Sequence, residues 1–275
     1  MFAALPLPSH DSVSARVRAI LASLLPLPHL GPQPLVDSLL GELVNMARLP
    51  LGLRRAEAVL RNLDTDGTLP SLHALCADAE YRLEADWARK VAVSANPLRM
   101  LRRFHYWTNY VKLARLEVKA LRSQNPDVKR VLFVGAGPLP LSSYMLAAKH
   151  GLQVDNLDRS GDACACALHW LKKLPKTGNM ACHHADVTEF GSFDGYDAVI
   201  LAALVGLSSA EKKRLIDYMA ARMKPEQLLL VRSVRGLRRL LYPMVHTAEL
   251  EGFEVMKAVH PRGEVINSAL VLRRK

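Results

Sequence analysis

Three loops in the second half of the chain carry residue types that can hold a nucleoside. The first is VGAGP at residues 134–138, where glycines let the backbone turn sharply and approach a ligand. The second ends an apolar run at Asp158, whose carboxylate can accept hydrogen bonds from both ribose hydroxyls; capping of the helix that starts in LDRSGDA is the alternative. The third holds Asp186, which can accept from an adenine amino group. The sequence therefore predicts an adenosine site.

The residues around VGAGP also bear on which nucleotide is bound. NAD and S-adenosylmethionine both contain adenosine, but only the dinucleotide needs room for a pyrophosphate. The third glycine of a dinucleotide fingerprint is absent, because residues 139–142 read LPLS. The prolines of GAGPLP stand where a pyrophosphate would approach most closely, which favours S-adenosylmethionine.

The first half of the chain carries candidate reacting groups. Ser71 is the expected N-cap of a helix on which Glu80 and Glu84 lie one turn apart beside an apolar stripe. Such carboxylates either do chemistry or are solvated or paired with arginine. Tyr106 and Tyr110 also lie one turn apart, either as packing or as an aromatic surface for a sulfonium or ammonium cation.

The pattern of apolar residues predicts two regions that position these groups. Residues 12–123 read as helices only, with apolar residues three or four apart. Beyond them, RVLFVGAG, LQVDNLD, NMACHH, YDAVILAA and QLLLVRS are five candidate parallel strands separated by helices. GFEVMKAVH and NSALVLRRK are predicted to form a closing antiparallel pair. We predict an N-terminal all-α helical bundle domain over 1–124 and a methyltransferase-like, Rossmann-type doubly wound α/β domain over 125–275.

Composition narrows the class of protein. The formal charge of +11 comes from scattered basic residues without an RNA-binding motif, which predicts no nucleic-acid partner. No run of about 18 apolar residues and no export leader is visible, so a cytoplasmic protein without membrane contact is expected. Neither Cys164 and Cys166 nor His183 and His184 have the spacing of a metal site, so none is predicted.

Seven segments together resemble the nicotianamine synthase family, including the bacterial members that make opine-type metallophores of the staphylopine and pseudopaline kind. The resemblance extends from about Leu72 onward, and the residues before Asn62 add little to it. Its segments are CADAEYRLEADW, NPLRMLRRFHYWTNYVKLARLE, VLFVGAGPLPLSSYML, VDNLDRS, YDAVILAALVG, RSVRGLRRLLYP and LEGFEVMKAVHPRGEVINS.

The resemblance implies roles for individual residues. Catalytic roles fall to Glu80, Glu84 and Tyr106, and it leaves open which glutamate is the functional acid. The cofactor-binding residues would be Tyr110, Gly135, Ala136, Gly137, Pro138, Asp158, Asp186, Leu201 and Ala202, within a pocket that residues 201–206 help to line. Arg232 and Tyr242 would bind the substrate, Arg232 as a bidentate clamp on an α-carboxylate, with a structural salt bridge as its alternative.

The resemblance also implies a reaction: transfer of the aminobutyrate arm of S-adenosylmethionine to the amine of a free amino acid, with release of methylthioadenosine. Plant members carry Pro-Tyr-Tyr where this chain has His105-Tyr106-Trp107, so the acceptor can differ. Histidine is the working acceptor, since the bacterial members add one unit to an amino acid. A methyltransferase and a basic nucleic-acid-binding module are the alternatives, and a homodimer is the assembly considered.

Overall fold

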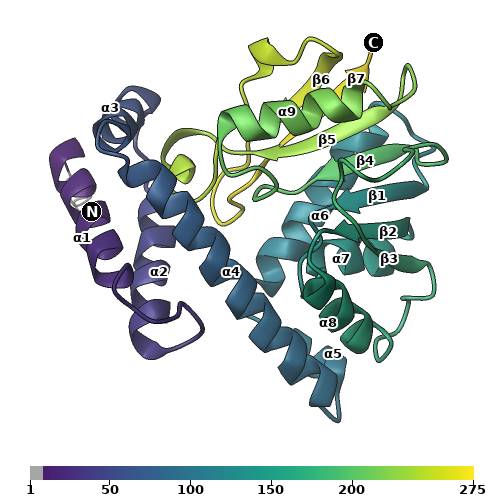
Figure 1. The fold of residues 1–275 in the computed structure, drawn as a ribbon, viewed down its shortest axis with the longest axis horizontal. Coiled ribbons are helices and arrows are strands. Elements are labelled where there is room, and N and C mark those ends of the chain that lie inside the picture. Colours follow the sequence, from purple (N-terminus) through teal and green to yellow (C-terminus); the bar gives the residue numbers. More distant parts are fainter. Residues whose placement is uncertain (1–8) are drawn as a thin grey trace, which may run out of the picture.

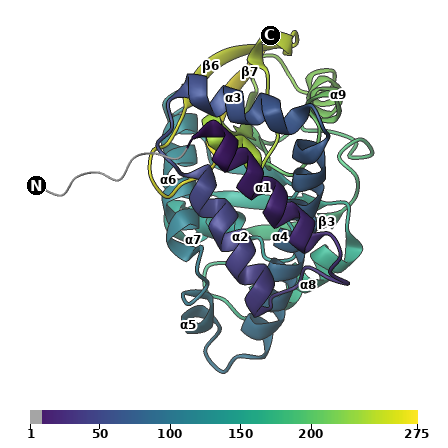
Figure 2. The same ribbon diagram turned by 90° about the vertical axis from the view of Figure 1, so that its left-hand side faces the viewer.

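Six helices make up the first part of the computed structural model, which describes residues 9–275, and confirm the predicted run of helices without strands (Figure 1). They are α1 (His10–Leu24), α2 (Pro34–Ala47), α3 (Leu53–Asp64), α4 (Thr68–Val93), α5 (Pro97–Leu101) and α6 (Trp107–Arg122). Figure 2 shows α1, α2 and α3 gathered on one side of the molecule. The sequence predicts no export leader. That prediction concerns a segment that includes residues 1–8, which lie outside the described part.

The start of α4 corrects one prediction, because Ser71 is not its N-cap. The helix begins three residues earlier at Thr68, after Gly67 in the left-handed region at φ +73°. Pro70 fits there because the amides of a helix's first turn have no intrahelical acceptor. Ser71 then lies inside the helix, and its hydroxyl donates to the Gly67 carbonyl at 3.0 Å.

A seven-stranded sheet in the order β3-β2-β1-β4-β5-β7-β6 forms the second part. Strands β1 (Arg130–Val134), β2 (Gln153–Asp158), β3 (Met180–His184), β4 (Ala198–Leu201) and β5 (Leu228–Ser233) are parallel. The last two, β6 (Phe253–Val259) and β7 (Ser268–Arg274), are antiparallel to each other, and β7 pairs antiparallel with β5. All seven predicted strands are confirmed.

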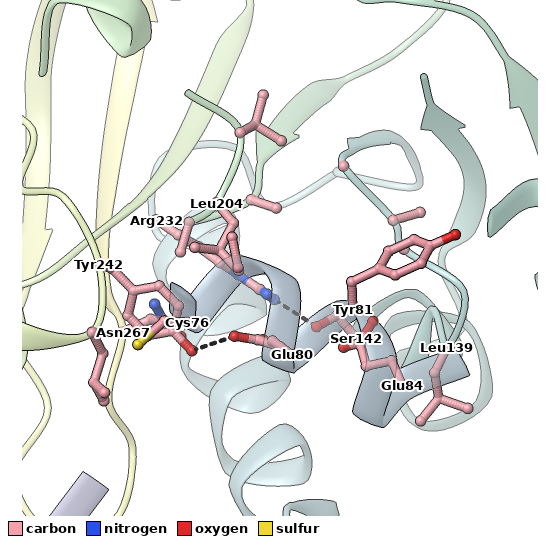
Figure 3. Close-up of a pocket in the computed structure, with 18 of the residues that line it drawn as sticks. Cys76, Glu80, Tyr81, Glu84, Leu139, Ser142, Leu204, Arg232, Tyr242 and Asn267 are labelled. Atoms are coloured by element: carbon pink, nitrogen blue, oxygen red, sulfur yellow. Dashed lines mark hydrogen bonds between the residues drawn. The ribbon is translucent and has the colours of Figure 1, made fainter. Parts of the chain in front are cut away.

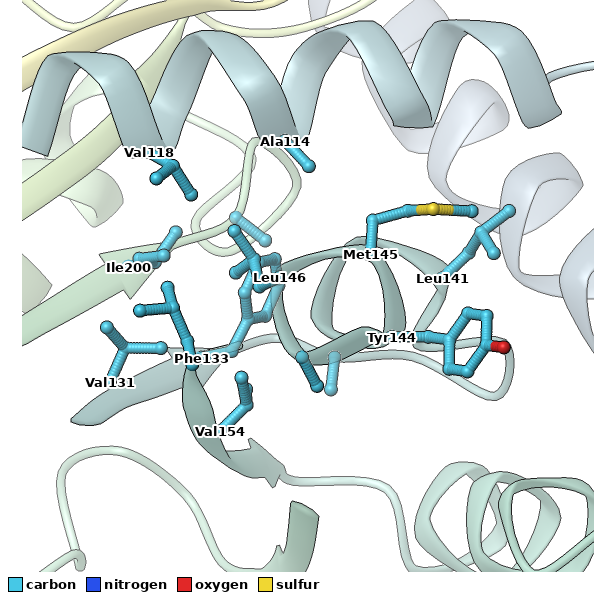
Figure 4. Close-up of a cluster of buried hydrophobic side chains, with 14 of the residues drawn as sticks. Ala114, Val118, Val131, Phe133, Leu141, Tyr144, Met145, Leu146, Val154 and Ile200 are labelled. Atoms are coloured by element: carbon cyan, nitrogen blue, oxygen red, sulfur yellow. The ribbon is translucent and has the colours of Figure 1, made fainter. Parts of the chain in front are cut away.

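Helices cover both faces of this sheet, as the continuous apolar strands require. Helices α6, α7 (Leu141–His150) and α8 (Gly161–Leu171) cover one face, and α9 (Ser209–Ala220) covers the other. In Figure 4, Val118 of α6 and Leu146 of α7 lie beside Ile200 and Phe133 of the strands. The remaining segments are two 3₁₀ turns, η1 (Gly236–Leu240) and η2 (Thr247–Glu249).

Helix α4 takes part in two hydrophobic cores, one in the helical bundle and one between the sheet and the helices α6, α7 and α8. Its first half buries Leu72 and Leu75 against α1, α2, α3 and η1. Its second half buries Ala88 and Val91 in the core that contains α6, α7 and the sheet. The side chains between these halves therefore lie where the two parts of the molecule meet. The domain boundary between residues 124 and 125 stays a prediction, since α6 belongs to the sheet's own core.

The described residues, 9–275, contain no helix that is both long and apolar enough to span a membrane. Over the same range, no three His, Cys, Asp or Glu side chains gather as ligands of a metal ion would.

Candidate active site

A cleft of about 1240 Å³ lies between the carboxyl ends of the parallel strands and the middle of α4. Loops that follow β1, β2, β3 and β4 line one end of it, which we call the nucleoside end. Residues of α2, α4 and α6 and the segment after β5 line the other, which we call the reacting end. Ligands of parallel α/β folds bind at this edge of the sheet.

Two glycines and Asp158 build the nucleoside end. Gly135 and Gly137 have φ values of +81° and +69°, which residues with a Cβ rarely adopt. Asp158 accepts from the Gly137 amide at 2.8 Å and from the Ser160 amide at 2.9 Å. The N-cap of α8 is Ser160, whose hydroxyl accepts from Ala163. Asp158 is thus not the helix cap and holds the glycine turn in place.

A buried lysine fixes the loop at residues 202–207, which walls the same end. Lys212 of α9 is 1% exposed, and its Nζ donates to the Ala203 carbonyl at 2.7 Å and the Ala202 carbonyl at 3.4 Å. Burial lowers the pKa of Lys212 to about 7. The loop packs tightly on the glycine turn, because a Cβ added to Gly135 would lie 2.1 Å from Val205 Cγ2.

The other predicted nucleoside contacts divide into two groups. Asp186 lines the cleft and is partly exposed, and its Oδ1 accepts from the Thr188 amide and hydroxyl, which lowers its pKa. Ala136, Pro138 and Ala202 line the cleft as well. Leu201 does not: it is 0% exposed and packs in the core beneath α9.

Glu80 and Glu84 both face the cleft from the middle of α4 (Figure 3). Neither forms a salt bridge within the described part of the chain. Each accepts a hydrogen bond from a tyrosine of another element: Tyr242 donates to Glu80 Oε2 at 3.0 Å, and Tyr110 donates to Glu84 Oε1 at 3.1 Å. Glu84 also meets the nucleoside end, since its Oε2 would lie 2.6 Å from a Cβ at Gly137. Both side chains are partly exposed in the cleft, and neither is paired with arginine.

The surroundings raise the pKa of both carboxyl groups. Burial raises the pKa of Glu80. Burial and the neighbouring charge of Glu80 raise the pKa of Glu84 well above its ordinary value. Neighbouring carboxylates disfavour ionising together, so the two groups titrate as a pair and hold a proton to higher pH than an isolated glutamate would. Such a pair can hold one proton and accept another.

Tyrosine side chains surround these carboxyl groups. Burial and the charge of Glu80 raise the pKa of Tyr106 to about 12, and burial also raises the pKa of Tyr110 and Tyr242 well above the ordinary range. All three line the cleft, so they are part of the pocket as well as of the packing. They stay protonated at neutral pH and act as hydrogen-bond donors.

Arg232 forms a structural salt bridge, which was the alternative to a substrate clamp. Its Nε and Nη2 donate to the two oxygens of Glu117 at 2.6 and 3.0 Å, and Nη2 also donates to Ser142 Oγ at 2.8 Å. Glu117 of α6 is 0% exposed and Arg232 is 6% exposed, so this pair joins α6 to β5 inside the protein. Arg232 still lines the cleft, but its bidentate edge is engaged.

Sequence reasoning missed several polar residues at this site. Glu117 lies in an amphipathic helix pattern and looks like a surface residue. Asn109 and Asn267 line the cleft, and each has a buried amide atom without a hydrogen-bond partner among the described residues. Asn267 belongs to the GEVINS segment, but its type and spacing alone indicate no chemistry.

The parallel sheet with its antiparallel β7, and a ligand cleft at the glycine turn, define a methyltransferase-like α/β protein with an added helical bundle. Magnesium protoporphyrin IX methyltransferase (ChlM) from Synechocystis PCC 6803, solved with bound SAM, has a similar fold, with a TM-score of 0.50 and 16% identity over 69% of this chain and 90% of that one. A crystal structure of MtNAS in complex with MTA and tNA resembles the whole molecule, with a TM-score of 0.86 and 21% identity over 96% and 97% of the two chains.

The family model described as nicotianamine synthase protein matches residues 8–275. Nicotianamine synthase 9 of Hordeum vulgare is 39% identical over 272 residues, covering 96% of this chain and 79% of the relative. Nicotianamine synthase 3 of Oryza sativa subsp. indica is 37% identical over 273 residues, with coverage of 96% and 79%. The chain belongs to the nicotianamine synthase family. The match also corrects the predicted extent of the resemblance, since it includes the residues before Leu72.

Proposed function

We propose that the chain transfers the aminobutyrate group of S-adenosylmethionine to the amine of a free amino acid, with histidine as the acceptor, and releases methylthioadenosine. The product would be an intermediate of an opine-type metallophore. The observation that carries this proposal is the pair of carboxyl groups, Glu80 and Glu84, that faces the nucleoside end of the same cleft.

The nucleoside end fits S-adenosylmethionine. Each carboxylate oxygen of Asp158 accepts one hydrogen bond from a backbone amide. Each oxygen can therefore still accept a hydrogen bond from a ribose hydroxyl. Asp186 keeps part of its carboxylate exposed in the cleft. The absence of a Cβ at Gly135 and Gly137 lets the backbone approach the ligand. MtNAS has been crystallised with MTA, and a mutant of it with S-adenosylmethionine, which supports the same pair of ligands here.

S-adenosylmethionine supplies an alkyl group that its sulfonium activates toward nucleophiles. The protein decides which of the three attached carbons reacts by orienting an amine in line with one C–S bond. Glu80 is suited to accept the proton that the amine loses as its nitrogen bonds to the aminobutyrate arm, because its carboxylate faces the cleft from the middle of α4. The electron pair of the broken C–S bond stays on sulfur. Tyr106 and Tyr110 present aromatic rings to the cation.

Histidine as the acceptor is supported by hydrogen-bond acceptors at the reacting end. Asn109 has a buried side-chain carbonyl without a donor among the described residues. Asp37 of α2 lines the same end and acts electrostatically on both His105 and Tyr106. An imidazole offers an N–H to such groups, whereas an aliphatic side chain would leave the Asn109 carbonyl buried and unpaired.

Product analysis tests the proposal. The protein is incubated with S-adenosylmethionine and each candidate amino acid, and the products are identified by mass. We expect methylthioadenosine together with histidine that carries one aminobutyrate unit. S-adenosylhomocysteine and a methylated acceptor would replace the proposal with a methyltransferase. Turnover with a different amino acid would retain the transfer and reject histidine.

A further inference from the structure

The amide of Asn267 is the most deeply buried polar group that the reacting end leaves unused. Asn267 directly precedes β7, is 7% exposed and lines the cleft. Its Nδ2 has no hydrogen-bond partner among residues 9–275. Burying an unpaired donor costs about 1–3 kcal/mol, so native proteins rarely keep one without a purpose. A ligand oxygen in the cleft would satisfy it.

Two other donors of the cleft, Tyr242 and Arg232, are already engaged. Tyr242 donates to Glu80, and Arg232 donates to Glu117 and Ser142. Arg232 therefore does not present its bidentate edge to a substrate carboxylate. The protein needs another donor for that carboxylate, because leaving it unpaired in a partly desolvated cleft would be costly.

Asn267 and Glu80 line the same cleft, as recognition of an α-amino acid requires. The amine and the carboxylate of such an acceptor are attached to one carbon, so the group that binds the carboxylate must lie close to the proton acceptor. Figure 3 shows Asn267 on the side of Tyr242 and Cys76, and the Tyr242 hydroxyl donates to Glu80. Leu139, which belongs to the nucleoside end, appears on the side of Glu84.

We propose that Asn267 recognises the acceptor by donating a hydrogen bond from Nδ2 to its α-carboxylate, while Glu80 faces its amine. This inference rests on the proposed aminobutyrate transfer and names the group that selects α-amino acids among amines. The acceptor's side chain then extends toward α2, where Asp37 lines the cleft. An amine without the carboxylate lacks the contact that Asn267 provides.

A comparison of histidine with histamine, which lacks the carboxylate, tests this role. The wild-type protein is assayed first, and the absence of methylthioadenosine and of an aminobutyrate adduct would defeat the proposed function and this inference with it. Given wild-type turnover, we expect Asn267→Ala to lower kcat/KM for histidine by about 10- to 100-fold, as for a hydrogen bond to a charged group. The kcat/KM for histamine as a substrate, or its inhibition constant if it acts as a competitive inhibitor, should stay within about threefold of the wild-type value.

Two measurements on Asn267→Ala and two further variants separate recognition from damage to the fold. S-adenosylmethionine affinity and the thermal unfolding midpoint should change little in Asn267→Ala. Asn267→Asp keeps the side-chain shape but repels a carboxylate, so it should lose more activity with histidine and gain relative preference for histamine. Asn179→Ala removes an amide that lies outside the cleft and donates to the Leu152 carbonyl, and it should leave the preference unchanged. Equal losses with histidine and histamine, or no loss with either, would overturn the role of Asn267.

Discussion

The two ends of the cleft are built in different ways. At the nucleoside end, the contacts come from short loops that directly follow consecutive strands, and backbone groups form much of the surface. At the reacting end, side chains from α4, α6 and the segment after β5 meet, and Tyr242 contacts Glu80 across 162 residues of sequence. The sheet and its loops alone thus determine the shape of the nucleoside end. The shape of the reacting end depends also on how the helical bundle packs on the sheet.

This difference separates binding of the cofactor from selection of the reaction. A local, backbone-built site can serve many reactions on one cofactor, and a methyltransferase such as ChlM has the same fold class. The particular reaction depends on what the added helices place opposite it. Variants at the two ends should therefore affect different kinetic constants.

The largest effect is expected at Glu80. Glu80→Gln removes the proton acceptor without changing the shape of the side chain, so turnover should fall by about two orders of magnitude or more. S-adenosylmethionine affinity, measured by calorimetry, should remain nearly intact. Glu84→Gln is the matched variant and should reduce turnover less, because Glu84 lies against the glycine turn of the nucleoside end, where its Oε2 would be 2.6 Å from a Cβ at Gly137. Unchanged turnover in Glu80→Gln would remove it from the mechanism.

The next effect is expected at Gly135, at the nucleoside end. Gly135→Ala adds a Cβ that would lie 2.1 Å from Val205 Cγ2 in a backbone conformation with φ of +81°. The strained turn should weaken S-adenosylmethionine binding by about 10-fold or more and destabilise the protein by about 1–3 kcal/mol. Calorimetry and thermal unfolding measure these two effects.

Gly151→Ala provides the control for Gly135→Ala. Gly151 has a similar φ of +71°, but an added Cβ would meet nothing within 4 Å. Gly151→Ala should therefore destabilise the protein through backbone strain without weakening S-adenosylmethionine binding. Equal losses of affinity in the two variants would mean that the contact with Val205 has no part in shaping the site.

A smaller effect is expected from Tyr242→Phe, which leaves Glu80 without its donor. The hydrogen bond from Tyr242 lowers the pKa of Glu80, so its loss should raise that pKa further. Because Glu80 must be ionised to accept a proton, the acidic limb of the kcat/KM profile should move to higher pH. At neutral pH the rate should fall by about 3- to 10-fold. Tyr110→Phe, whose hydroxyl donates to Glu84, should leave the position of this limb unchanged.

The smallest effect is expected on stability: Lys212→Met should change how the free energy of unfolding depends on pH. The pKa of Lys212 is lowered to about 7 from 10.5, so between these values the unfolded chain binds more protons than the folded one. The free energy of unfolding of the wild type should therefore rise with pH over that window. Lys212→Met should flatten this rise in denaturant titrations. Lys213 is the next residue in sequence and pairs with Asp217 at the surface. Lys213→Met should preserve the rise of the free energy of unfolding with pH.

The sequence predicted the fold well because its signals are local. Aliphatic runs between helical stretches located every strand, and the glycine turn and Asp158 that the sequence singled out both line the cleft. Alternation along β1 explains why this works: Phe133 packs beneath α6 and α7, whereas Val134 packs beneath α9, so a strand buried on both faces is apolar throughout.

The reacting end was less predictable because its partners are distant in sequence. Spacing placed Glu80 and Glu84 on one helix face, but nothing near them indicated Tyr242 or Tyr110 as their donors. Arg232 could be a substrate clamp or a salt bridge, and only the packing of α6 on β5 brings Glu117 to it. Asn267 became notable through its unpaired burial, which no sequence pattern reveals.

Helix α4 also limits how substrates can reach the carboxyl groups. It runs without a break over 26 residues, with its first half in one hydrophobic core and its second half in the other. Swinging the bundle away from the sheet as a rigid body would require bending this helix close to Glu80 and Glu84, with loss of its backbone hydrogen bonds. Entry and exit are therefore expected through the rim near Asp37 and Arg48, by rearrangement of side chains and loops rather than by a hinge.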